Sequence, residues 1–190
     1  MLSEALQYQR DAVNAGQWWR FATASFVHWS WDQVMWDGIA FVVLALIAAR
    51  LWRVRFFVAF VVSAIAIPLF VHFFVRGVDT YRGLSGVDSA LFALVAIRIG
   101  GQAKAPVLHW ICFVAFASKI AFEMFSGSTM FVRELAPGVA SLPVAHLVGA
   151  AIGVVAALLP ELRLQCMQLF DQRSDRILES LHAYGEWFSG

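Results

Sequence analysis

The chain has 190 residues, of which 61% are hydrophobic and 14% are charged, and its formal net charge is +1. Soluble globular domains carry about 25% charged residues. The composition therefore excludes an ordinary soluble domain and favours an integral membrane protein with several spans. The near-neutral charge gives no indication of a nucleic-acid partner.

The N-terminal segment, residues 1–33, is predicted to be an external loop at the membrane surface. Glu4, Arg10 and Asp11 come too early for a membrane helix, and the segment lacks the apolar core of a signal peptide. It then becomes rich in aromatic residues in the stretch WWRFATASFVHWSW. Such residues favour the membrane–water interface.

Apolar stretches that follow predict an all-α, polytopic transmembrane helical bundle. A membrane-spanning helix needs about 20 apolar residues. The five predicted spans are residues 34–49, 56–75, 84–99, 106–125 and 143–159. Because the third and fifth are short, we expect their polar starts to lie in a wet zone lined by protein. Together with the N-terminal loop they form a predicted membrane domain, residues 1–160.

The C-terminal segment, residues 161–190, has apolar residues at helical spacing. It predicts an amphipathic helix on the inner membrane surface or docked on the bundle, and a solvated helical tail is the alternative.

The basic residues predict the orientation of the chain. Eight lie in the loops after the first and third spans and in the tail, against five on the other side. Basic residues are enriched on the cytoplasmic side of membranes. We therefore expect the tail in the cytoplasm and residues 1–33 outside. The predicted location is a bacterial inner membrane, with the active site facing outward.

Two polar residues stand at matching depths in this scheme. Ser85 begins the third span and His146 begins the fifth, and both spans run from outside to inside. A serine hydroxyl is a poor nucleophile until a base accepts its proton, and histidine is the usual base near neutral pH. Ser85 and His146 are therefore the candidate nucleophile and base.

Glycines surround both candidates. Gly83 and Gly86 flank the serine, and Gly149 and Gly153 form a GxxxG pattern after the histidine. Small residues at this spacing let membrane helices pack closely, as a bond between the serine and the histidine would require. Generic helix packing is the alternative for each motif taken alone.

The chain resembles the rhomboid intramembrane serine proteases in three places: WWRFATASFVH, GLSG at 83–86 and AHLVGAAIG at 145–153. The compact size and the stretches LQYQRDAVNAGQWWR and SKIAFE resemble the rhombosortase branch, which implies substrates with a C-terminal Gly-Gly sorting segment. The resemblance implies an endopeptidase that needs no cofactor. Its substrates would be membrane-anchored proteins, cut in or near their transmembrane segment.

The resemblance also assigns roles to single residues. Ser85 would be the nucleophile and His146 the general base, with no third acid. The oxyanion would be met by the Ser85 backbone N–H and by side chains at the start of the first span, where Gln33 and Asp37 replace a histidine and an asparagine common in the family.

Three residues of the external loop match the family's pattern as structural residues: Trp19, Arg20 and His28.

Two carboxylates depart from the family's pattern. Asp37 would repel an oxyanion unless burial keeps it protonated, and the alternative is that it bonds the neighbouring helix. Asp88 and Ser89 share the face of Ser85. Either Asp88 or Ser89 is hypothesised to orient His146 by a hydrogen bond, in place of the aromatic ring that many members of the family have at the Ser89 position. The alternative is that Asp88 caps the helix or bonds Arg82.

Lys119 and Glu123, four residues apart in the fourth span, predict an intrahelical ion pair that lowers the cost of insertion, or else a substrate or ion path. With no cluster of cysteine and histidine, no metal site is expected.

Two other functions compete with the protease. The rhomboid core has six spans, and the span before the Trp-Arg loop is missing from this sequence, which is either truncated, misassigned at its start, or complete with five. That absence, with Gln33 and Asp37, favours an inactive rhomboid-like protein that binds membrane clients. A transporter that uses Asp37, Asp88 and the Lys119–Glu123 pair is the second rival, although it would lack internal repeats.

Overall fold

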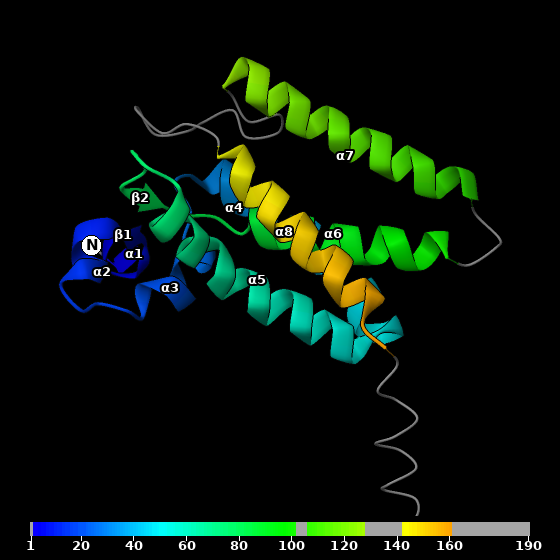
Figure 1. The fold of residues 1–190 in the computed structure, drawn as a ribbon, viewed down its shortest axis with the longest axis horizontal. Helices are drawn as coiled ribbons and strands as arrows, with labels where there is room; N and C mark the ends of the chain where they lie inside the picture. The colour runs from blue at the N-terminus through cyan, green and yellow to red at the C-terminus, as the bar shows by residue number, and fades with distance from the viewer. Residues whose placement is uncertain (1, 102–105, 128–141, 161–190) are drawn as a thin grey trace, which may run out of the picture. The chain divides into compact units, whose positions relative to one another are not determined.

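The structure, a computed structural model, describes residues 2–101, 106–127 and 142–160. These residues are mostly helical, and all five long helices belong to one compact unit, residues 1–158 (Figure 1). The long helices are α4 (Trp31–Leu51), α5 (Arg53–Phe74), α6 (Ser85–Gly100), α7 (Pro106–Ser126) and α8 (Pro143–Leu158). Each coincides with one predicted span. The predicted tail, residues 161–190, lies outside the described residues.

Two of these helices are long and apolar enough to cross a membrane, namely α4 and α5, and α8 is a shorter apolar helix. Large apolar side chains such as Trp31, Ile39 and Leu46 are exposed along α4. Apolar side chains on the outside of a helix suit contact with lipid. That all five helices cross the membrane stays a prediction.

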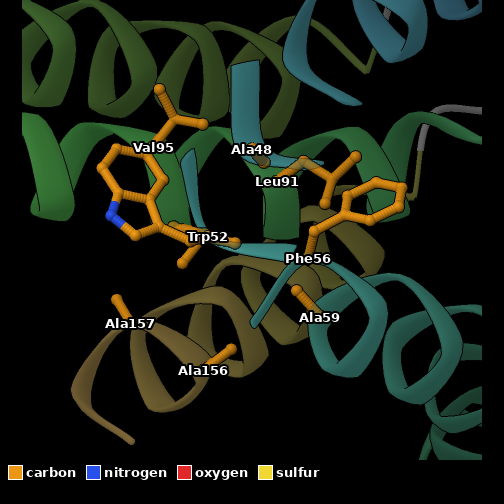
Figure 2. Close-up of a cluster of buried hydrophobic side chains, with 9 residues drawn as sticks. Ala48, Trp52, Phe56, Ala59, Leu91, Val95, Ala156 and Ala157 are labelled. Carbon is orange, nitrogen blue, oxygen red and sulfur yellow. The ribbon is translucent and has the colours of Figure 1, made fainter. Parts of the chain in front are cut away.

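The α4–α5 junction builds one part of the core. Ser30 caps α4 by accepting a hydrogen bond from the backbone N–H of Gln33, at 3.2 Å. At the other end of α4, the chain turns at Trp52 and enters α5, and the Trp52 side chain is buried. Figure 2 shows the cluster around this tryptophan, which takes residues from α4, α5, α6 and α8: Ala48, Trp52, Phe56, Ala59, Leu91, Leu94, Val95, Ala156 and Ala157.

Helices α6 and α8 pack so closely that α8 has no room for a side chain at Gly149 or Gly153. A Cβ added to Gly149 would lie 1.9 Å from the backbone oxygen of Gly86, and one added to Gly153 would lie 2.0 Å from that of Ala90. Only glycine fits at these two positions, because the neighbouring atoms belong to the backbone and cannot swing away. α7 also contacts α6, where Phe92 stacks on Phe116.

The N-terminal segment folds onto one end of the bundle in short pieces. These are α1 (Leu2–Leu6), β1 (Tyr8–Gln9), α2 (Arg10–Asn14), α3 (Arg20–Thr23) and the 3₁₀ helix η1 (Ala24–Phe26). β1 pairs antiparallel with β2 (Thr80–Tyr81), which immediately precedes α6. The two-residue ladder was not predicted and departs slightly from an all-α fold. It ties the start of the chain to the residues that lead into Ser85.

Arginines anchor this segment. The Arg10 guanidinium donates to the carbonyls of Val71, His72 and Val75, at the end of α5, where a cation is stabilised by the helix dipole. Arg20 is buried and donates to the carbonyls of Glu4 and Gln7. These bonds join α3 to α1 and to the residue that precedes β1.

Pro68 lies inside α5 and is fully buried. Because proline has no N–H, the carbonyl of Ala64, four residues earlier, loses its helical partner. The hydroxyl of Ser25, in η1, donates to that carbonyl at 3.2 Å. The external segment is thus docked against α5 at the point where the helix has a free acceptor.

Candidate active site

Ser85 is the first residue of α6, and a turn made at Gly83 places it there. Gly83 has φ +125°, a conformation that side chains rarely adopt, and a Cβ on it would lie 2.6 Å from Nε2 of Gln33. Its N–H donates to the carbonyl of Ala24 at 3.3 Å. The hydroxyl of Tyr81 donates to the carbonyl of Gly83 at 3.2 Å, and burial raises the pKa of Tyr81, so this donor keeps its proton.

The position at the start of α6 suits a nucleophile. The first turn of a helix leaves its N–H groups without intrahelical acceptors, and the helix dipole is positive there. Ser85 is half-buried, and its hydroxyl makes no hydrogen bond to another residue in the described part of the chain. A negative oxygen that develops beside Ser85 would therefore meet free backbone donors.

His146 lies in the first turns of α8 and its ring reaches α6. The residue is 5% exposed. Its Nδ1 is 3.3 Å from the backbone oxygen of Ser85 and 3.1 Å from Oγ of Ser89. The structure thus brings Ser85 and His146 side by side, although the Ser85 hydroxyl itself is not bonded to the ring.

Ser89 occupies the position that was hypothesised to orient the base. Its Oγ lies 2.9 Å from the carbonyl of Ser85, to which it donates, and it lies on the Nδ1 side of the His146 ring. It therefore links the ring to the residue that carries the candidate nucleophile.

The other ring nitrogen meets two charged residues of α7. Nε2 of His146 is 3.1 Å from Oε2 of Glu123 and 3.4 Å from Nζ of Lys119. Lys119 and Glu123 also form the predicted intrahelical ion pair, at 2.7 Å. The contact with His146 was missed by the sequence analysis. The i,i+4 spacing predicts the pair, but nothing in the sequence gives the rotation of α7 about its axis.

Asp37 and Gln33, the residues expected to meet an oxyanion, lie against the turn that precedes Ser85. Oδ2 of Asp37 accepts the N–H of Leu84 at 3.3 Å and is 3.3 Å from Nε2 of His28. The alternative expected for Asp37 was a bond to the neighbouring helix, and Leu84 is the residue that caps the start of α6. The side-chain oxygen of Gln33, Oε1, accepts the N–H of Trp29 at 2.8 Å, while the side-chain nitrogen, Nε2, lies against Gly83.

Asp88, in the first turn of α6, is buried, and its Oδ1 has no hydrogen-bond partner within the described ranges. The guanidinium of Arg82 is used elsewhere: it donates to the side chain of Gln7 and the carbonyl of His28, and it stacks on the Trp29 ring at 4.2 Å. A bond between Asp88 and Arg82 is therefore not what holds this carboxylate.

Gly86 is also confined. A Cβ there would lie 2.7 Å from Cδ1 of Ile67 and 3.1 Å from the backbone oxygen of Ala145. Ile67 belongs to α5 and Ala145 to α8, so the small residue after the serine lets both helices approach the start of α6.

No group of three histidine, cysteine, aspartate or glutamate residues is placed to hold a metal ion among the described residues. What the site does contain is a hydroxyl at a helix start, an imidazole against it, and charged groups behind the imidazole. This combination is suited to acid–base and nucleophilic chemistry.

The sequence model of the Rhomboid domain matches residues 15–160, which include Ser85, His146 and all five long helices up to the end of α8. No curated protein matches the chain significantly.

Proposed function

The chain belongs to the rhomboid family of membrane proteins, which acts on transmembrane substrates within the bilayer, and we propose that it is a serine endopeptidase using Ser85 and His146. The observation that carries the proposal is the 3.3 Å approach of the His146 ring to Ser85 across 61 residues of sequence. Two helices packed through glycines hold this contact. The alternative of an inactive client-binding protein has no comparable observation in its favour.

The proposed reaction follows the two-step chemistry of a serine protease. The Ser85 oxygen attacks the scissile carbonyl while its proton passes to His146, and the negative oxygen that forms is met by backbone N–H groups at the start of α6. His146 then gives the proton to the leaving amine. An acyl group remains on Ser85 until a water, deprotonated by His146, attacks it.

Labelling with a fluorophosphonate, which reacts with activated serines, tests the proposal. We expect the purified full-length protein to be labelled, and both Ser85→Ala and His146→Ala to lose labelling. Ser63→Ala is the matched control, because Ser63 is buried in α5, where its hydroxyl donates to the carbonyl of Phe60. A folded protein that takes up no label would favour the client-binding alternative.

We also propose the rhombosortase-like branch, which the compact size and the stretches around Arg20 and Lys119 support. The expected substrates carry a C-terminal Gly-Gly segment followed by a membrane anchor. Two reporter substrates, identical except that one has Gly-Gly and the other Ala-Ala in this segment, test the preference. We expect the protease to cleave the Gly-Gly reporter in preference to the Ala-Ala reporter. Equal cleavage of both would leave a rhomboid protease without this preference.

A further inference from the structure

The turn between α4 and α5 carries arginines at the end of the bundle away from Ser85. Arg50 lies in the last turn of α4 and Arg53 is the first residue of α5, and both side chains are exposed. Arg98, in the last turn of α6, has its guanidinium carbon 5.5 Å from the centroid of the Trp52 ring, which lies at the same turn. We call Arg50, Arg53 and Arg98 the arginine cluster.

The exposed arginines of this cluster meet no carboxylate among the described residues. In that part of the chain α5 and α8 contain no acidic residue, α4 contains none after Asp37, and α6 contains none after Asp88. Both aspartates lie towards the Ser85 turn. The turn between α4 and α5 therefore presents positive charge that the described helices do not neutralise.

The helix dipole accounts for only one of the two exposed arginines. Arg50 is at the carboxyl end of α4, where the dipole stabilises a cation. Arg53 is at the amino end of α5, where the dipole disfavours a cation, and the first turn of α5 contains no acidic residue to offset it. Charge that only oriented the chain could lie anywhere in the loop, so the position of Arg53 favours an anion from outside the polypeptide.

Each exposed arginine has an exposed apolar side chain one helical turn further from the loop. Leu46, four residues before Arg50 on α4, is 68% exposed, and Phe57, four residues after Arg53 on α5, is 50% exposed. Residues four apart lie on the same face of a helix. Each of these two faces thus presents a guanidinium at the turn and apolar surface along the helix. A phospholipid has the matching order, with a phosphate above acyl chains.

The residue type also suits a phosphate. A guanidinium is planar and can donate two parallel N–H groups to phosphate oxygens, whereas the ammonium group of lysine acts as a point charge. All three members of the cluster are arginines. Arg98 lies within the range of a cation–π contact with Trp52, and this contact holds its positive charge beside the turn.

We propose that the arginine cluster binds the headgroup phosphate of an anionic phospholipid, whose acyl chains lie along Leu46 and Phe57. Arg50 and Arg53 contact the phosphate, and Arg98 adds positive charge next to them. Basic residues between membrane helices on the cytoplasmic side bind anionic headgroups in this way, and the basic residues predict that this turn is cytoplasmic. The site uses no group of the candidate active site.

A lipid titration of the purified full-length protein in detergent tests the proposal. The two lipids are phosphatidylglycerol, which is anionic, and phosphatidylcholine with the same acyl chains, whose headgroup has no net charge. The readout is the midpoint of thermal unfolding, because a ligand that binds the folded state raises it in a concentration-dependent way. We expect phosphatidylglycerol to act at lower concentration than phosphatidylcholine, and this difference to shrink as added salt screens the charges.

Substitutions of the exposed arginines identify the site. We expect Arg50→Gln and Arg53→Gln each to raise the apparent dissociation constant for phosphatidylglycerol about 5-fold, and the two together about 25-fold. Arg53→Lys keeps the charge and loses the planar fork, so its effect should be smaller than that of Arg53→Gln. Arg76→Gln is the matched control, because Arg76 is an exposed arginine just beyond the other end of α5, and it should leave the lipid affinity unchanged.

Three results would overturn the proposal. The first is equal stabilisation of the wild type by the two lipids. The second is an equal loss of affinity in Arg53→Gln and Arg76→Gln, which would be a general effect of surface charge. The third is an equal rise of the midpoint with inorganic phosphate at the same concentration, which would leave an anion site without a lipid. Midpoints measured without lipid show that each variant is folded, and Arg53→Lys replaces Arg53→Gln in these comparisons if the glutamine variant is unstable.

Discussion

At the scale of single residues, the turn before Ser85 is held by Asp37, one of the two side chains that the sequence analysis expected to meet an oxyanion. Asp37 uses Oδ2 to accept the N–H of Leu84, and the same oxygen lies near Nε2 of His28. It therefore behaves as an acceptor that fixes the backbone next to the nucleophile. A carboxylate in this place does not help a negative oxygen to form.

Asp37→Asn tests this role of the aspartate. The asparagine carbonyl can still accept the N–H of Leu84, and its amide adds a donor, so we expect the fluorophosphonate labelling rate to equal or exceed that of the wild type across pH. Asp37→Val leaves the Leu84 N–H buried without a partner, which costs about 1–3 kcal/mol, and should lower both stability and rate. A labelling rate in Asp37→Asn well below that of the wild type would assign the carboxylate a catalytic part.

The sequence predicted part of this site for identifiable physical reasons. The depth of Ser85 and His146 in two parallel-running spans, and the glycines beside each, predicted that they would meet. The contact of Glu123 with the ring depends on how α7 is rotated about its own axis. Rotation is set by packing, as between Phe92 and Phe116, and leaves no mark in residue spacing.

At the scale of helices and strands, the α6–α8 contact is the feature that brings the site together. Gly149 and Gly153 face the backbone oxygens of Gly86 and Ala90. Helices that approach this closely are held by van der Waals contact between backbones, because lipid provides no hydrophobic drive for helices to associate.

Gly153→Ala should therefore separate the two helices. The added Cβ would lie 2.0 Å from the oxygen of Ala90, and overpacking of this kind costs about 1–3 kcal/mol. We expect a lower midpoint of thermal unfolding in detergent and slower labelling of Ser85. Gly38→Ala in α4 is the matched control, because a Cβ there meets nothing within 4 Å; alanine should be neutral or slightly stabilising there, through its higher helix propensity. Equal stability of the two variants would contradict the close contact.

The helices were predictable and the short elements were not. Long apolar runs predicted the places of α4 to α8, because a run of about 20 apolar residues is typical of a membrane helix. The two-residue pairing of β1 with β2 rests on contacts across more than 70 residues, such as Tyr8 with Tyr81. It is too short to leave an alternating pattern in the sequence.

At the scale of the whole molecule, the direction of α4 links the site to one side of the membrane. Its start carries Gln33 and Asp37 near the Ser85 turn. Its last turn carries Arg50, and Arg53 and Arg55 follow after Trp52 at the start of α5. Basic residues favour the cytoplasmic side. The site at the other end of α4 is therefore expected to face outward.

Thiol labelling tests this orientation in the full-length protein. In a background with Cys112→Ser and Cys166→Ser, single cysteines are introduced as Asn14→Cys in the N-terminal segment and Leu51→Cys at the α4–α5 turn, where both native side chains are exposed. We expect a membrane-impermeant maleimide to label Asn14→Cys on intact spheroplasts, and Leu51→Cys only after the membrane is permeabilised. Neither change removes a charge, so the distribution of basic residues that predicts the orientation is preserved. The reverse pattern would place Ser85 and His146 on the cytoplasmic side, and substrates would then have to be sought among proteins cleaved from that side.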